Sequence, residues 1–186
     1  MSTTPGRTAS SHSFFSCKTV IKRPRLISNA LWRSIRTTLI AAAFANILIY
    51  WGHWQEALTW IKSAKRLNPF PPNIYHWYHA LALYSAREYE QAIKVLREAR
   101  SSDRWSRALL AACYAQTNRP REASFEADAF VRERYLELTE NGEALPLNTL
   151  ELARMRADRY RDPIDRDHFL NGLRKAGLSD GLFNLV

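Results

Sequence analysis

The sequence predicts an all-α fold: a right-handed α-solenoid of about three helix pairs, followed by C-terminal capping helices. A short phrase centred on alanine occurs at residues 54–58, 89–93 and 120–124, and its alanines stand 35 and 31 residues apart (57 to 92, then 92 to 123). A repeat of about 34 residues is typical of stacked helix pairs. Glycine is scarce, at 6 of 186 residues, and 46% of the residues are hydrophobic. This composition favours helices and is sufficient for a core.

The repeats follow the tetratricopeptide pattern, in which small residues let the two helices of a pair approach closely. The eighth position of all three units is alanine, at Ala45, Ala80 and Ala111. A long side chain there would push the paired helices apart. Because no single unit can bury its apolar stripe alone, three units are the usual minimum for stability. We therefore expect tetratricopeptide repeats over residues 31–140.

Turn and stop signals divide the repeat region. Gly52 is expected in the turn of the first pair, because glycine adopts a positive φ readily. Asn68 should end the second helix, since a residue that precedes proline is driven away from helical geometry. Asn141 and Gly142 form a stop signal after the last repeat helix.

Residues 146–178 are expected to form a pair of capping helices over the open end of the solenoid. The first should begin at about Asn148 and run through Tyr160. The second should begin at Asp162–Pro163, with aspartate as the N-cap and proline as the first helical residue.

The net charge of +9 is carried by the N-terminal part of the chain. Residues 1–55 contain seven Lys and Arg and no Asp or Glu, so the remaining 20 basic residues are balanced by all 18 acidic ones. We interpret residues 1–30 as a disordered, solvated basic segment and expect no nucleic-acid partner. The two cysteines are too few for a disulfide framework or a zinc site, which agrees with a cytoplasmic protein.

The apolar run at residues 39–51 is shorter than the roughly 20 residues that a membrane span needs. The repeat pattern explains it as the buried first helix, so membrane contact is not favoured. A membrane-tethered repeat protein anchored through residues 31–51 is nevertheless kept as an alternative.

No pattern in the sequence predicts a catalytic, cofactor-binding or metal site. His76 and His79 stand three residues apart but lack a third ligand nearby, and both fall at packing positions. Cys113 is expected to be a small buried residue. The chain has neither a glycine-rich phosphate loop nor a nucleophile elbow, so we expect a non-catalytic protein.

The remaining candidate is the concave face, which the first helix of each pair lines in such solenoids. Large aromatic side chains on this face are typical of binding hot spots. The face is apolar rather than basic, which argues against capture of an acidic peptide terminus. A groove filled by the C-terminal helices or by the N-terminal segment is the alternative. The expected partner-binding residues are Asn46, Tyr50, Trp77, Leu81, Tyr84, Trp105 and Gln116.

Three segments resemble a known family. They are NPFPPNIYHW at residues 68–77, YEQAI at residues 89–93 and the tail YRDPIDRDHFLNGLRKAGL at residues 160–178. Together they are similar to the tetratricopeptide region of bacterial class III adenylate/guanylate cyclase-like proteins. In that family a cyclase domain precedes the repeats, and nothing in residues 1–39 resembles it. The resemblance therefore implies the non-catalytic C-terminal part alone.

These observations predict a non-catalytic protein–protein interaction module that binds a protein, a peptide or another copy of itself. Three finer hypotheses remain open. The chain is an accessory to cyclic-nucleotide signalling, a remnant or regulatory fragment of a cyclase-like protein, or a membrane-tethered repeat protein.

Overall fold

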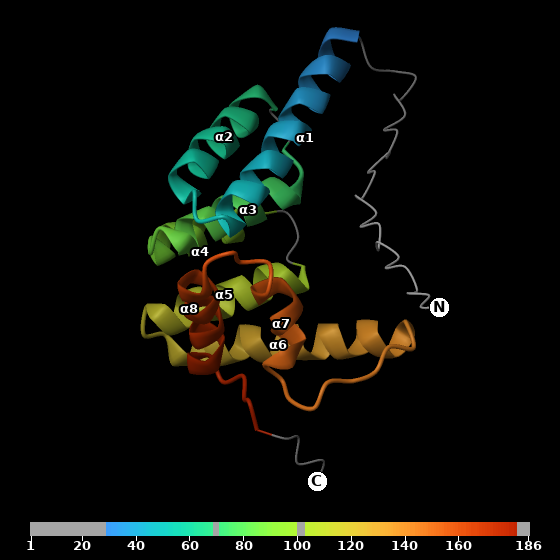
Figure 1. Ribbon diagram of the computed structural model, residues 1–186, viewed down its shortest axis with the longest axis vertical. Coiled ribbons are helices and arrows are strands. Elements are labelled where there is room, and N and C mark those ends of the chain that lie inside the picture. The colour runs from blue at the N-terminus through green and yellow to red at the C-terminus, as the bar shows by residue number, and fades with distance from the viewer. Residues whose placement is uncertain (1–28, 69–70, 100–102, 182–186) are drawn as a thin grey trace, which may run out of the picture.

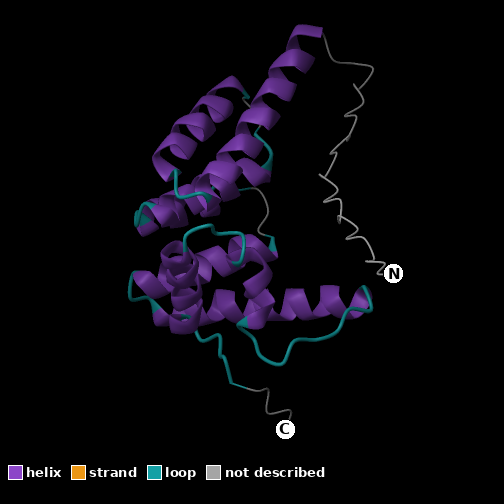
Figure 2. Ribbon diagram, viewed as in Figure 1, coloured by secondary structure: helices purple, strands orange, loops and turns teal. Residues whose placement is uncertain are grey.

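A computed structural model describes residues 29–68, 71–99 and 103–181. Over these residues the chain is all-α, as predicted, with eight helices and no strand (Figures 1 and 2). The helices are α1 (Asn29–Tyr50), α2 (Trp54–Leu67), α3 (Asn73–Ser85), α4 (Tyr89–Arg97), α5 (Arg104–Gln116), α6 (Pro120–Glu140), α7 (Glu151–Ala157) and α8 (Pro163–Lys175).

The first six helices form three stacked pairs, α1 with α2, α3 with α4 and α5 with α6 (Figure 1). α8 does not extend this stack as a fourth unit but returns to pack against α5, with α7 beside it. The predicted alanines hold the pairs together: Ala45, Ala80 and Ala111 on the first helices are all 0% exposed. At these positions the backbone of the first helix can approach the second helix closely, because the alanine side chain is only a methyl group.

The three turns within the pairs share one backbone device. Two residues after the end of each first helix stands a residue with positive φ, which is +85° at Gly52, +66° at Arg87 and +58° at Asn118. The amide of the following residue then donates to a carbonyl five residues back, at 2.8–2.9 Å in all three turns. This is the bonding of a Schellman motif, which satisfies carbonyls at a helix end. The sequence predicted the turn at Gly52, whereas Arg87 carries no residue-type signal for a left-handed conformation.

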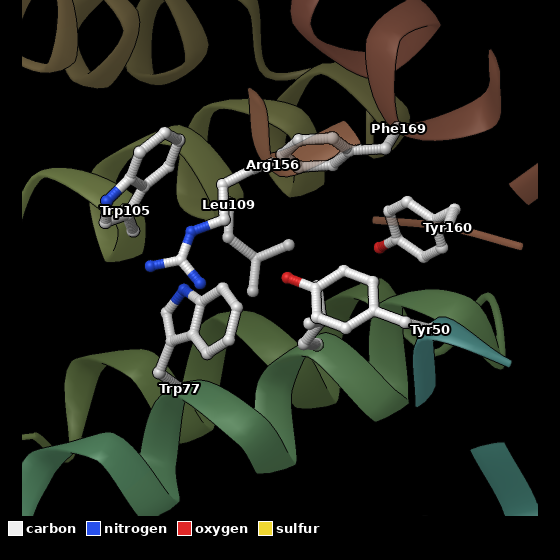
Figure 3. Close-up of a pocket in the computed structure, with 8 residues that line it drawn as sticks. Tyr50, Trp77, Trp105, Leu109, Arg156, Tyr160 and Phe169 are labelled. Atoms are coloured by element: carbon white, nitrogen blue, oxygen red, sulfur yellow. The ribbon is translucent and has the colours of Figure 1, made fainter. Parts of the chain in front are cut away.

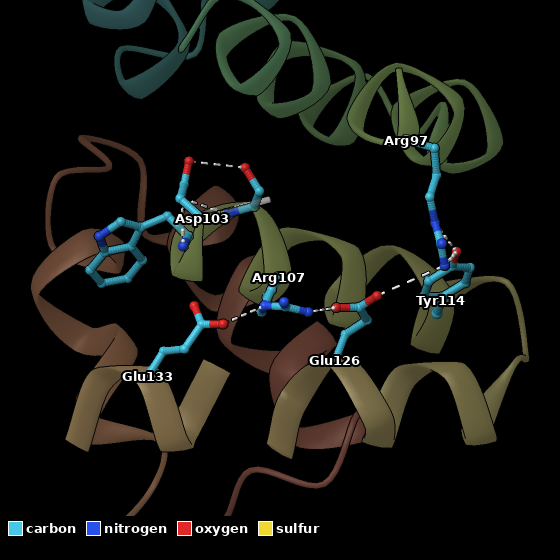
Figure 4. A network of polar contacts seen from close by, with 8 residues as sticks. Arg97, Asp103, Arg107, Tyr114, Glu126 and Glu133 are labelled. Carbon is cyan, nitrogen blue, oxygen red and sulfur yellow. Dashed lines mark hydrogen bonds and ion pairs between the residues drawn. The ribbon is translucent and has the colours of Figure 1, made fainter. Parts of the chain in front are cut away.

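An ion-pair network centred on the buried Glu126 joins α4, α5 and α6 (Figure 4). Glu126 is 5% exposed, and its carboxylate lies 3.0 Å from the Arg107 guanidinium and 3.8 Å from that of Arg97. Arg107 also pairs with Glu133 at 2.6 Å, and Arg97 donates to the Tyr114 hydroxyl at 2.8 Å. A buried carboxylate is tolerated only with such partners, so the network fixes how the third pair sits on the second.

Several expected boundaries are confirmed and one is wrong. α2 ends at Leu67, with Asn68 extended before the proline, and α8 begins at Pro163, with the Asp162 carboxylate accepting from the Ile164 amide. The helix expected from about residue 148 through Tyr160 is only α7. The side chain of Asn148 accepts from the Glu151 amide at 2.9 Å and so delays its start.

The structure describes only part of the N-terminal region about which the sequence makes predictions. Of the segment expected to be disordered, residues 1–28 lie outside the described residues, whereas residues 29 and 30 form the start of α1. No helix in the described part of the chain is both long and apolar enough to cross a membrane.

Candidate functional site: the covered concave face

The seven residues expected on the concave face come from three helices, α1, α3 and α5, that lie side by side in the stack. Four of them are buried, and the exposed fraction does not exceed 6% for Tyr50, Trp77, Leu81 or Tyr84. Asn46, Trp105 and Gln116 are half-buried. The cover is the chain's own α7, α8 and the loop between them.

Arg156 of α7 enters the middle of this face (Figure 3). Its guanidinium carbon lies 4.7 Å from the ring centroid of Trp77 and 4.6 Å from that of Trp105. A guanidinium group at such distances from two indole rings makes cation–π contacts with both, worth more where water is excluded. Arg156 therefore occupies the aromatic site that was expected to receive a partner.

Tyr84 of α3 binds the first turns of α8. Its hydroxyl donates to the carbonyl oxygen of His168 at 3.2 Å, and its ring packs on the imidazole of His168 and edge-on against Phe169. The Tyr89 hydroxyl lies 3.2 Å from Nε2 of the same histidine. Burial raises the pKa of Tyr84 far above its ordinary value, because a charged phenolate would lose its hydration there. The hydroxyl therefore remains a neutral donor.

Gly172 brings α8 into direct backbone contact with the groove. A Cβ atom built on it would lie 2.4 Å from the Tyr84 hydroxyl and 3.0 Å from the Cβ of Ala112. Any side chain would clash with a fully buried neighbour. This glycine is thus required by close packing and not by backbone conformation.

The edges of the cover reach the first and third units. The amide of Arg161 donates to the carbonyl of Tyr50 at 2.8 Å, at the end of α1. The Lys175 ammonium donates to the side-chain carbonyl of Gln116 at 3.1 Å, at the end of α5. What remains of the groove is a cavity of about 10 Å³, which is the volume of a single water-sized probe.

The structure therefore brings the predicted residues together but leaves no open groove above them. It shows the C-terminal helices filling the concave face, which was the alternative left open by the sequence. Whether a partner ever binds these seven residues stays a prediction, because such a partner would have to replace α7 and α8.

Sequence reasoning missed an apolar stripe on the outward side of the first pair. Ile40, Phe44, Ile47 and Trp51 follow one another at helical spacing, and between 43% and 66% of each is exposed. The ring of Phe44 meets Trp60 of α2 edge-on at 5.7 Å, and Trp60 is also exposed. The signal was present as the spacing of these residues, but the whole run was interpreted as a buried helix. Phe44 lies in this run, and 43% of it is exposed.

The histidines and the cysteine lie where the packing prediction placed them. Burial lowers the pKa of His76, and it lowers that of His79 to about 4, with the nearby charge of Lys65 adding to the effect. Cys113 is fully buried, which raises the pKa of its thiol. In the described residues no three His, Cys, Asp or Glu side chains come together as a metal site would require.

The stacked pairs and their buried alanines define the class of the protein as a tetratricopeptide-like helical repeat protein. Residues 51–130, from the end of α1 into α6, match the family described as anaphase-promoting complex, cyclosome, subunit 3. Comparison with curated proteins and with solved structures gives no significant match. Repeats of this class generally mediate protein–protein interaction and are generally non-catalytic. The comparisons lend no support to the resemblance to cyclase-like proteins.

Proposed function

We propose that this chain is a non-catalytic scaffold that binds a protein through the outward face of its first helix pair, and that the partner is a second copy of the chain. The observation that carries the proposal is the exposed stripe of Ile40, Phe44, Ile47 and Trp51, with Trp60 beside it. A contiguous apolar patch on a soluble surface is typical of a protein-binding site. Because the concave face is filled, this stripe is an aromatic surface that stays exposed among the described residues.

The position of the stripe favours a helical partner. Within the described residues the first pair has a neighbouring pair on one side, where α3 packs against α2 and α1. The outward face of α1 is therefore where a further helix would pack. Four apolar residues over three turns match the length of an amphipathic helix face.

The absence of charge along the stripe favours a second copy of the chain as the source of that partner helix. Residues 37–50 contain no charged side chain, although the whole chain has a net charge of +9. Two copies related by a two-fold axis would place stripe against stripe without opposing like charges at the contact. A partner with a charged helix face would instead leave its charges buried and unpaired.

Sedimentation equilibrium over a range of protein concentrations tests this proposal. We expect reversible dimerisation of the full chain, loss of the dimer in Ile47→Glu, and retention of the dimer in Ile164→Glu. Ile164 is the matched control, since it is an isolated exposed isoleucine on α8, 71% exposed. Circular dichroism must show that both variants are folded. A wild-type chain that stays monomeric, or an Ile47→Glu chain that still dimerises, would contradict the proposal.

The concave residues are kept as a second candidate surface for the same function. A helical ligand would reach Trp77 and Tyr84 only by displacing α7 and α8. The displaced pair would expose five buried side chains, at a cost of about 10 kcal/mol. These buried side chains are Leu152 of α7, Phe169, Leu170 and Leu173 of α8, and Leu178 just after α8. Capture of a helical peptide by wild type, and its loss in a folded Trp77→Ala/Tyr84→Ala variant, would support this surface.

The three finer hypotheses rest on the sequence alone. A cyclase assay on the purified chain tests for intrinsic activity, and cyclic-nucleotide production would overturn the non-catalytic assignment. Membrane fractionation at moderate salt tests the tether through residues 31–51. An interrupted cyclase reading frame in the upstream DNA would support the remnant hypothesis.

A further inference from the structure

An arginine-rich depression lies between the start of α5, the end of α6 and α7, beside the covered concave face. Its volume is about 350 Å³. Arg104, Arg134, Arg156 and Arg159 line it, together with Glu137 and Glu143. Four guanidinium groups against two carboxylates leave an excess of two positive charges.

The ion pairs in the depression do not remove this excess. Glu137 is shared, since its two carboxylate oxygens pair with Arg104 and with Arg134. Glu143 accepts from the side-chain amide of Asn141 at 3.0 Å. Among the described residues no ion pair includes Arg156 or Arg159, whose side chains instead hydrogen-bond to Tyr50.

Buried donors at the same place remain unused. Arg134 is 7% exposed, and its Nε has no hydrogen-bond partner within the described structure. The Nε of Arg104 is likewise buried and unpaired there. A buried donor without a partner is unfavourable, so these two groups add uncompensated positive partial charge beside the depression.

We infer that this depression binds an oxyanion with two negative charges, namely a phosphate group. The planar fork of a guanidinium matches two phosphate oxygens at once, and two excess charges match a phosphate dianion. The ring of Trp105 offers no free face for a base, because Arg156 covers it at 4.6 Å and Phe130 packs against it at 5.6 Å. Recognition is therefore of the phosphate group itself, either as free phosphate or on a small molecule.

Binding of phosphate would also strengthen the cover over the concave face. Arg156 belongs both to the depression and to the cavity between Trp77 and Trp105 (Figure 3). An anion held by Arg156 would therefore favour the docked position of α7, and any ligand that binds only the folded state raises its stability. This coupling gives the binding a readout in thermal unfolding.

Calorimetric titration with inorganic phosphate, at ionic strength held constant with chloride, tests the inference. We expect saturable binding and a melting temperature raised by about 5 °C or more at 100-fold excess over Kd. Arg159→Gln and Arg104→Gln should each weaken binding about tenfold, as expected for one lost charge-assisted hydrogen bond. Arg154→Gln is the matched control. Arg154 is an exposed arginine of α7, and its guanidinium pairs only loosely with Glu151, at 3.8 Å.

Separate arms identify the ligand. Glycerol phosphate should bind as inorganic phosphate does if the group alone is recognised, and acetate, with a single charge, should bind more weakly. A phosphate effect no larger than that of chloride would overturn the inference. Equal affinities in wild type, Arg159→Gln and Arg104→Gln would overturn it as well. The calorimetric affinities are expected to be independent of dimerisation, because no residue of the α1 stripe lines the depression.

Discussion

The concave side of the first helices and the outward side of α1 are built from the same kind of residues but differ in what covers them. Both are rows of aromatic and aliphatic side chains at helical spacing. Tyr84, on the concave side, is 1% exposed, whereas Ile40, on the outward side, is 66% exposed. The difference teaches that the exposure of a helix stripe depends on which segment of the chain returns to it, and not on its own composition.

The area of the stack that the C-terminal helices cover ends between two neighbouring residues, Tyr50 and Trp51. Tyr50 is 6% exposed because the loop after α7 reaches it through the backbone of Arg161 and the ring of Tyr160. Trp51, the next residue, is 54% exposed, although the Arg161 guanidinium lies 5.5 Å from its ring. The C-terminal pair thus covers one side of the stack and stops at the end of α1.

A matched pair of phenylalanine substitutions measures this difference directly. Phe169→Ala on the covered side should lower the free energy of unfolding by about 3–5 kcal/mol, because it leaves a cavity under α8. Phe44→Ala on the outward side should cost about 1 kcal/mol or less, since the ring is already 43% exposed. Urea unfolding at a protein concentration low enough to keep the chain monomeric gives both values. Equal losses of unfolding free energy in the two variants would contradict the difference in burial between the two sides.

Gly172→Ala tests how closely the cover is packed. The added methyl would lie 2.4 Å from the Tyr84 hydroxyl, so one of two buried elements must move. We expect a net loss of about 1–3 kcal/mol, even though alanine favours a helix over glycine by about 1 kcal/mol. Asn171→Ala, at the exposed neighbouring position, is the control and should change stability by no more than about 0.5 kcal/mol. A stabilised Gly172→Ala chain would mean that α8 is not pressed against α3 and α5.

Much of the fold could be predicted from the sequence because its signals are local. Alanine at the eighth position, proline after Asn68 and the Asp162–Pro163 start each act within a few residues. Arg87 could not be predicted as a left-handed turn residue, since its conformation is imposed by the repeat and not by its side chain. The late start of α7 was missed because the Asn148 side chain accepts from the Glu151 amide and so competes with the helix for this backbone group.

The state of the candidate site could not be predicted in the same way. Periodicity assigned Trp77 and Tyr84 to the concave face, and the structure places them there. It could not say that Arg156, about 70 residues further along the chain, lies between Trp77 and Trp105, because no local pattern encodes that contact. Nor does periodicity distinguish an apolar stripe that is buried from one, such as Ile40 to Trp51, that remains open.

A test with a smaller expected effect concerns His79 on α3. It is half-buried, and so lies between the covered concave residues and the exposed stripe in its exposure. Its pKa in the folded chain is lowered to about 4 by burial, with Lys65, Lys62 and His76 adding repulsion. The unfolded chain, with an ordinary histidine pKa of about 6.5, therefore binds the proton more readily between these values. Stability should be constant above about pH 7 and should fall as the pH drops towards 4. The full difference corresponds to about 3 kcal/mol, which solvent screening at a half-exposed group reduces to about 1–2 kcal/mol.

His79→Leu should remove most of this pH dependence, because the leucine side chain is apolar and binds no proton. Urea unfolding at pH 7.5 and at pH 4.5 measures the change, and the variant should lose about 1–2 kcal/mol less than wild type between the two. A smaller dependence should remain, since burial also lowers the pKa of His76. His53→Leu, at an exposed position beside the first turn, is the control and should follow the wild-type profile. Parallel profiles for wild type and His79→Leu would show that water reaches this imidazole freely, and that the contact between the first and second pairs is more open than the concave face.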